Sequence, residues 1–212
     1  LFDHRPELND YPLVPMESFS FTARDGLTIH GYLSFPPGVE RSGLPAVLNV
    51  HGGPWTRVGW GFDPEAQWLA NRGYVAVSVN FRGSSGYGKE FLNAGNREWA
   101  AKMHDDLLDA VDHLVGKGYI DAKRVGIYGG SYGGFMTFMA LYRAPGTFKA
   151  GAALRPVSVI APLQQRLPGW LDAHAPTLRE TLEQGGELDD AARQRLVQTV
   201  AALCDELQQG GA

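Results

Sequence analysis

A serine lies at the centre of the most informative pattern in the sequence, Gly129-Gly130-Ser131-Tyr132-Gly133. The apolar run Val125–Tyr128 precedes this pattern, and a helical pattern reaching about Tyr142 follows it. A serine on so tight a strand-to-helix turn has a strained backbone, and small residues two positions before and after it prevent clashes. The pattern therefore predicts that Ser131 is a nucleophile in acyl transfer. We call residues 129–133 the elbow.

The same pattern predicts how negative charge would be stabilised during the reaction. Ser131 is expected at the N-terminus of a helix, where the partial positive charge favours a developing anion. The backbone N–H of Tyr132 is then placed to bind that oxyanion. A second N–H is expected from the glycines of His51-Gly52-Gly53-Pro54, because adjacent glycines after a buried strand let the backbone turn toward a substrate oxygen. His51 precedes Ser131, the wrong order for a base, so we expect it to orient this loop.

The elements that must position these residues are predicted to form a parallel sheet. Four short apolar runs are typical of strands buried on both faces: Ala46–Val50, Tyr74–Val79, Val125–Tyr128 and Ala150–Leu154. Helical segments separate them, and a repeated strand–helix–strand order indicates parallel strands with right-handed crossovers. Before them, an alternating pattern around Arg24-Asp25-Gly26 predicts a hairpin from Ser18–Thr22 and Leu27–Ser34.

Two helices in the predicted sheet region have clear end signals. Asp63 is expected to cap the first, with Pro64 at its first position and Gly73 after its end. Asp105 or Asp106 is expected to begin the second, which carries an apolar stripe and stops at Gly118.

The two ends of the sequence differ from its middle. Residues 1–17 contain three prolines and predict an extended linker. Their start lacks an initiator methionine and a signal peptide, which indicates a cut inside a longer protein. After Val159 the composition changes, because seven of the eight glutamines and only one aromatic residue follow it. Residues 160–212 predict a helical tail with helices over 176–184 and 189–209. A change of reading frame, a gene fusion or a truncation would each explain the break.

A general base for Ser131 is not evident. The only histidine after Ser131 is His174, and Asp172 lies two residues before it. In this kind of site the carboxylate and the histidine come from separate loops after later strands. One short segment cannot supply both in that way, so an exposed loop histidine is the favoured interpretation of His174, and a base the alternative.

The composition excludes several other classes of function. A net charge of −4 and a pI near 5.9 argue against nucleic-acid or anionic-lipid partners. The single cysteine, Cys204, cannot form an internal disulfide, and no Cys/His cluster predicts a metal site. No apolar run is long enough to span a membrane. We therefore expect a cytoplasmic protein that uses no metal or other cofactor.

Four blocks in order resemble the peptidase domain of the prolyl oligopeptidase (S9) family, closest to its acylaminoacyl-peptidase and dipeptidyl-aminopeptidase branch. These blocks are His51–Trp55, Asn80–Gly88, Asp105–Leu107 and Gly129–Gly134, and the resemblance covers about residues 1–159. It implies Ser131 as the nucleophile, with oxyanion N–H groups from Tyr132 and Gly53. It also implies structural roles for Arg82 and Asp106, and a β-propeller before the linker 1–17. The family's triad Asp and His would lie beyond the end of this chain.

Together these observations predict an α/β-hydrolase fold over residues 18–159, with a parallel-rich sheet, flanking helices and a helical C-terminal tail. The resemblance implies a serine peptidase that cleaves oligopeptides through an acyl-enzyme on Ser131. One alternative is an esterase or lipase, because the same elbow serves any acyl transfer. The other is a catalytically incomplete domain that acts as a binding or dimerising piece, and a homo-oligomer is compatible with each. A sheet without its later strands is also expected to expose apolar surface.

Overall fold

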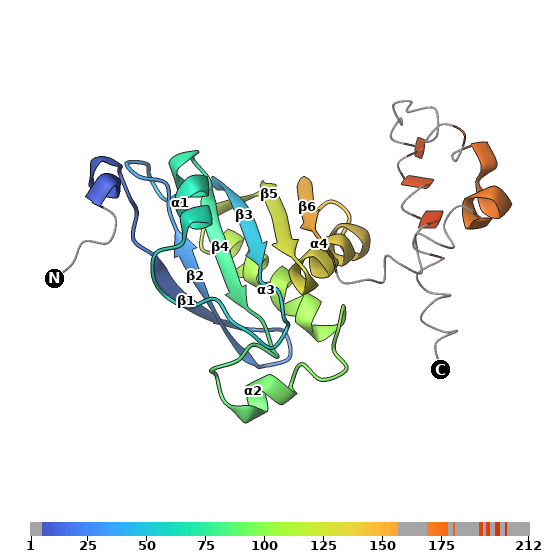
Figure 1. Ribbon diagram of the computed structural model, residues 1–212, viewed down its shortest axis with the longest axis horizontal. Helices are drawn as coiled ribbons and strands as arrows, with labels where there is room; N and C mark the ends of the chain where they lie inside the picture. The colour runs from blue at the N-terminus through green and yellow to red at the C-terminus, as the bar shows by residue number, and fades with distance from the viewer. Residues whose placement is uncertain are drawn as a thin grey trace. The chain divides into compact units, whose positions relative to one another are not determined.

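The computed structural model describes residues 6–156 and 169–177, and further single positions at 180, 191, 192, 194, 195, 198, 199 and 202. The chain divides into two compact units, Leu1–Arg155 and Pro156–Ala212. The first unit contains the sheet and its helices (Figure 1). Within the parts of the chain that the structure describes, no helix has the length and apolar character needed to cross a membrane.

Six strands form one sheet in the order β1-β2-β4-β3-β5-β6. Their bounds are Glu17–Thr22 (β1), Thr28–Ser34 (β2), Leu44–Val50 (β3), Val75–Asn80 (β4), Ile120–Gly130 (β5) and Ala150–Leu154 (β6). The last four pair in parallel, which confirms the predicted parallel sheet. The predicted hairpin forms as β1 and β2, and β2 extends the sheet by pairing antiparallel with β4.

Helices cover both faces of the sheet (Figure 1). On one face α1 (Pro64–Asn71) packs its buried Ala66 and Leu69 against Ala76 of β4. The other face carries α3 (Lys102–Gly116) and α4 (Tyr132–Arg143), whose buried apolar residues form the main core. Every residue of β4 is buried as a result, which explains why most of them are apolar.

The end signals of α1 are confirmed. The Asp63 carboxylate accepts hydrogen bonds from the backbone N–H groups of Glu65 and Ala66 at 2.9 and 3.2 Å, and Pro64 is the first helical residue. Gly73, after the helix, has φ +87°, a conformation that favours glycine.

The predicted start of α3 was wrong. The helix begins at Lys102, and its capping position, Ala101, provides no side-chain hydrogen bond. Asp106 is instead fully buried inside the helix, where it pairs with Arg82. A carboxylate with a buried guanidinium partner is stabilised without a helix terminus, so the capping signal was misleading here.

Three further differences concern segment limits. Residues Pro6–Asp10 of the expected extended linker form a 3-10 helix, η1, and Lys89–Asn93 form a short helix, α2, that was not predicted. Strand β5 starts at Ile120, earlier than expected. In the second unit, residues 169–174 are helical, as are the described positions within the predicted helices 176–184 and 189–209, most of which lie outside the described residues.

The strand order places a topological switch point next to β3. The chain moves from β3 to β4 on one side, and β5 pairs with β3 on the other. In open α/β sheets the crevice outside the carboxyl ends of such strands is where ligands bind. The loop after β3 and the elbow after β5 both lie at this edge.

Candidate active site

The elbow has the strained geometry expected of it. Ser131 has φ +56° and ψ −120° and lies between β5 and α4, with its side chain exposed. Few residues other than glycine adopt a positive φ, and here the surrounding packing imposes it. A Cβ atom on Gly133 would lie 1.9 Å from the Val50 carbonyl oxygen, and one on Gly129 would lie 2.5 Å from the same atom. Glycine is therefore required at both positions for α4 and β3 to approach so closely.

The glycine loop after β3 lies directly against the elbow. A Cβ atom on Gly52 would be 3.3 Å from the Gly130 carbonyl oxygen and 3.5 Å from the Ser131 Cβ. The next residue, Gly53, is exposed and has φ +115°. Sequence reasoning thus placed together two segments that the structure brings into contact.

Two backbone N–H groups remain free beside Ser131. Tyr132 is the first residue of α4, and the first N–H groups of a helix have no acceptor within it. Among residues 6–156 no hydrogen bond engages the N–H of Tyr132 or that of Gly53. A pair of unengaged donors next to an exposed hydroxyl can bind an oxygen that becomes negatively charged.

His51 fixes the shape of the glycine loop. Its Nδ1 donates to the Gly52 carbonyl oxygen at 2.7 Å, and its Nε2 lies 2.9 Å from the Ser84 hydroxyl oxygen. Burial lowers the pKa of His51, which favours the neutral ring. The Ser84 hydroxyl donates its own proton to the Phe81 carbonyl oxygen at 2.6 Å. The ring also stacks on Phe81 with centroids 4.3 Å apart. These contacts agree with the expected orienting role.

Sequence reasoning missed a second clamp on the same loop. The side chain of buried Asn80 accepts from the Val58 N–H at 2.8 Å and donates to the Val58 carbonyl at 3.0 Å. The Ser85 N–H donates to the Thr56 carbonyl at 2.9 Å. A polar residue at the end of an apolar strand was the only available signal, and it does not identify its partner.

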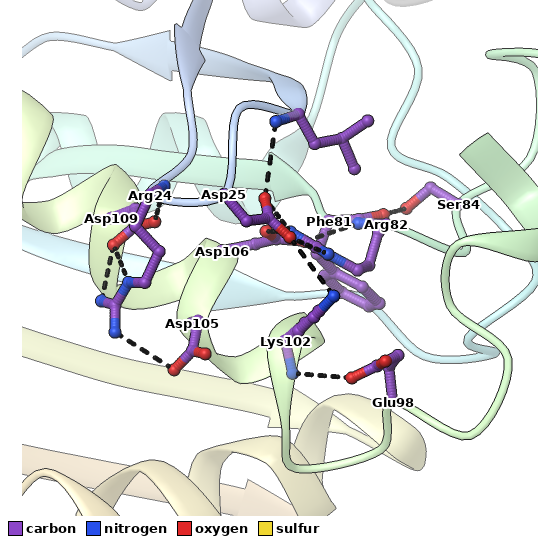
Figure 2. Close-up of polar contacts among 11 residues, drawn as sticks. Arg24, Asp25, Phe81, Arg82, Ser84, Glu98, Lys102, Asp105, Asp106 and Asp109 are labelled. Atoms are coloured by element: carbon purple, nitrogen blue, oxygen red, sulfur yellow. Dashed lines mark hydrogen bonds and ion pairs between the residues drawn. The ribbon is translucent and has the colours of Figure 1, made fainter. Parts of the chain in front are cut away.

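Arg82, which follows β4, connects the end of that strand with α3 and with the turn of the hairpin (Figure 2). Its guanidinium donates two hydrogen bonds to Asp106, at 2.9 and 2.7 Å, and two to Asp25 in the hairpin turn, at 2.7 and 2.9 Å. Its backbone N–H also donates to Asp106. Arg82 lowers the pKa of Asp25 to about 2, while burial raises the pKa of Asp106 against the opposing effect of Arg82. These hydrogen bonds hold the strand end, the helix and the hairpin turn together, which is the kind of structural role that the family resemblance implied for Arg82 and Asp106.

The side chain of Tyr132 anchors the start of α4. Its hydroxyl donates to the Met103 sulfur at 3.2 Å, and its ring lies 5.8 Å from that of Phe81. Burial raises the pKa of this phenol well above its usual range, so it stays neutral. The phenol points into the core, and only the backbone N–H of Tyr132 is available to a substrate.

The surroundings of the Ser131 hydroxyl and of His174 bear on the choice of a base. Among residues 6–156 no hydrogen bond joins the Ser131 hydroxyl to a histidine or a carboxylate. His174 belongs to the second unit, is exposed, and its Nδ1 donates to the Trp170 carbonyl of its own helix at 3.0 Å. In the described parts of both units, no cluster of three or more His, Cys, Asp or Glu side chains could bind a metal ion.

A mostly parallel sheet with flanking helices and a serine elbow after a central strand defines the α/β-hydrolase fold. The chain belongs to the prolyl oligopeptidase family, whose model matches residues 60–174.

Several peptidases are similar to the chain. It is 45% identical over 177 residues to dipeptidyl aminopeptidase BIII of Pseudoxanthomonas mexicana, covering 80% of this chain and 26% of the relative. It is 38% identical over 221 residues to dipeptidyl peptidase family member 6 of Caenorhabditis elegans, covering 94% and 30%. The solved acylaminoacyl peptidase of Pyrococcus horikoshii matches with a TM-score of 0.67 and 31% identity, covering 74% of this chain and 25% of that one. The chain thus spans between a quarter and a third of the length of these relatives.

Proposed function

We propose that this chain carries the nucleophile and the oxyanion site of a serine peptidase acting on peptides. The observation that carries the proposal is the position of Ser131, exposed and at φ +56° on the N-terminus of α4, with the glycine loop against it. Membership of a peptidase family supports peptides over simple esters as substrates.

The proposed reaction begins when the Ser131 oxygen attacks a peptide carbonyl carbon and its proton passes to a base. The carbonyl oxygen becomes an oxyanion, which accepts hydrogen bonds from the N–H groups of Tyr132 and Gly53. The C–N bond then breaks, the amine leaves with a proton, and an ester links the acyl group to Ser131. Water cleaves this ester and restores the hydroxyl.

A second candidate function is favoured by two observations on the first unit. No base hydrogen-bonds to the Ser131 hydroxyl within residues 6–156, and all five residues of the edge strand β6 are exposed. An open strand edge can pair with another chain. On this alternative the chain binds or dimerises without turnover. Light scattering tests it, because the alternative requires a defined oligomer or complex.

Imidazole rescue tests the catalytic proposal. We expect the full chain to hydrolyse p-nitrophenyl esters barely above background, because losing a triad base costs orders of magnitude in rate. Free imidazole in solution can accept the Ser131 proton, so it should raise the rate above that of Ser131→Ala under identical conditions. Equal imidazole-dependent rates for the two chains would disprove a nucleophilic Ser131. Strong hydrolysis without imidazole, abolished in both Ser131→Ala and His174→Ala, would identify His174 as the base.

A further inference from the structure

A groove opens on the α1 face of the sheet, beside its last two strands. Its volume is about 670 Å³, within the roughly 300–1,000 Å³ that is usual for small-molecule sites. Helix α1 packs on β4, and all five residues of β6 are exposed (Figure 1). Neither Ser131 nor the glycine loop lines this groove, so it is a second concave surface on the first unit.

The strand register explains why the sheet is hollow at this point. Gly126 of β5 pairs with Ala150 of β6. Tyr128 pairs with Ala152 in the same register, so all four residues lie on one face of the sheet. Three of them have a methyl group or no side chain, and Trp68 of α1 also lines the groove. A glycine inside a strand often marks a place where a ligand approaches the backbone closely, so a flat ring fits on this floor beside the indole.

One carboxylate gives the groove its polarity. Glu65 is the only charged side chain among the described residues that line it. The Tyr128 hydroxyl donates to Glu65 Oε2 at 2.5 Å, and the Asn49 side-chain amide donates to the same oxygen at 3.5 Å. Within the described part of the chain, no hydrogen bond engages Glu65 Oε1. One oxygen of the carboxylate is thus anchored to the sheet, and the other is left for a ligand.

The surroundings of Glu65 favour a cation over an anion. Burial raises the pKa of the Tyr128 phenol well above its usual range, and the Glu65 carboxylate raises it further, so the phenol stays a neutral donor. Asp63 adds a second negative charge near that phenol. The N-terminus of α1 offers an anion little, because the Asp63 carboxylate already accepts from the N–H groups of Glu65 and Ala66.

The indole of Trp68 is held in place from its own helix. The Arg72 guanidinium carbon lies 4.4 Å from the centre of the indole ring, and the guanidinium donates to the Trp68 carbonyl at 3.2 Å. Arg72 does not line the groove, so it supports the indole without occupying the hollow. Because 56% of Trp68 is exposed, the indole keeps surface for a second aromatic contact.

We propose that this groove is a binding site for a small aromatic cation, whose flat ring lies on the small residues of β5 and β6 beside Trp68 and whose ammonium group binds Glu65. The site goes beyond the proposed function, because it uses no residue of the elbow or of the glycine loop. The ring leaves water for apolar surface, and the ammonium group donates a charge-assisted hydrogen bond to the carboxylate. A neutral analogue lacks that bond, and the carboxylate repels an anionic analogue.

Three indoles of similar shape and different charge test the site on the full chain: tryptamine, tryptophol and indole-3-propionate. Amide NMR spectra of the isotope-labelled chain follow each titration and give a dissociation constant. Tryptamine should bind about fivefold more tightly than tryptophol, a modest factor because Glu65 is exposed and its charge is screened, and indole-3-propionate should bind least. The shifts that tryptamine causes should centre on Gly126 and Ala152 and leave Tyr132 unchanged.

Two variants separate the charge from the shape of the groove. Glu65→Gln removes the charge but keeps an oxygen that accepts from Tyr128, so it should lower tryptamine affinity to that of tryptophol and change tryptophol binding by less than about twofold. Glu90→Gln is the matched control, because Glu90 is exposed on α2 and does not line the groove. Ala152→Leu fills part of the floor, so it should weaken the binding of all three indoles by about tenfold.

Binding of none of the three indoles, equal binding of tryptamine and tryptophol, or an unchanged preference in Glu65→Gln would overturn the site. Shifts centred on Tyr132 would place the ligand at the elbow and would also overturn it. If no indole binds and light scattering shows a dimer, the occupant of the groove is another copy of the chain. Ala152→Leu remains informative if Glu65→Gln fails to fold. Ser131→Ala should bind tryptamine as the unchanged chain does, so this proposal and the proposed function fail separately.

Discussion

The elbow and the β6 side of the same sheet differ sharply in how they are packed. At the elbow, β3 and α4 approach so closely that Gly133 and Gly129 have no room for a Cβ atom. Beside β6, by contrast, an open groove of about 670 Å³ lies on the α1 face, with a floor that includes Ala150 and Ala152 and a wall that includes Trp68. Most of the residues that line this groove are apolar.

This difference shows that the geometry of Ser131 is a local property of three neighbouring elements. The elbow depends on contacts among β3, β5 and α4, and on the loops that Asn80 and His51 fix. None of these contacts involves the groove. Changes at the elbow should therefore be severe, and changes in the groove mild.

The largest effect is expected at Gly133. Gly133→Ala would put a Cβ atom against a backbone oxygen that cannot move alone, so we expect a loss of more than ~4 kcal/mol of unfolding free energy, or no folded protein. Gly130→Ala is the matched control, because the nearest atom to its Cβ would be 3.8 Å away. Urea denaturation compares the two. Similar stabilities would contradict the close packing of β3 and α4.

The next effect concerns the Arg82 network. Asp106→Ala leaves a buried guanidinium with one carboxylate partner fewer, and we expect a loss of about 3 kcal/mol. Asp109→Ala removes a partner of Arg24, which is half exposed, and should cost no more than about 1 kcal/mol. Chemical denaturation of both variants measures the contrast. Equal losses of unfolding free energy in Asp106→Ala and Asp109→Ala would show that burial of the Arg82 network does not affect stability.

A smaller effect depends on pH. The folded pKa of Asp25, about 2, lies below its ordinary value near 3.9, so its ionised form stabilises the fold. This contribution is complete above about pH 4 and is lost as the pH falls toward about 2. Asp25→Asn should therefore cost ~1 kcal/mol at pH 7, after allowance for solvent screening, and progressively less below about pH 4. Urea denaturation at pH 7, 4 and 3 measures the difference in unfolding free energy between Asp25→Asn and the unchanged chain. A difference that grows as the pH falls would contradict the prediction.

The smallest effects are expected on β6, where adjacent residues face different surroundings. Ala152 lines the groove, so Ala152→Leu should change the unfolding free energy by no more than about 0.5 kcal/mol. A Cβ atom on Gly151 would lie 2.5 Å from Leu141 of α4, so Gly151→Ala should cost about 1 kcal/mol. Thermal denaturation compares the stabilities of the two variants. A larger loss for Ala152→Leu than for Gly151→Ala would mean that the groove is filled in solution.

Much of the fold was predictable because its signals are local. The short, mostly apolar runs indicated the parallel strands, and Asp63 with Pro64 indicated the start of α1. The start of α3 was not predictable, because Asp106 resembles a capping residue until its partner Arg82 is known.

The candidate site was predictable to a similar extent. Side chains larger than hydrogen would clash at Gly129 and Gly133, and this need for glycine can be recognised within one short stretch of sequence around Ser131. The contacts of His51 with Ser84, of Asn80 with Val58 and of Trp99 with Tyr132 join residues that no local pattern connects. These pairings follow from the strand order and the loop paths, which short-range periodicity does not encode.

The most direct test of the account is the mass of the chain after incubation with a p-nitrophenyl ester and imidazole. We predict an increase equal to one acyl group, located by peptide mapping on Ser131 and absent from Ser131→Ala. No adduct under these conditions, or an adduct on another residue, would contradict the assignment of Ser131 as the nucleophile.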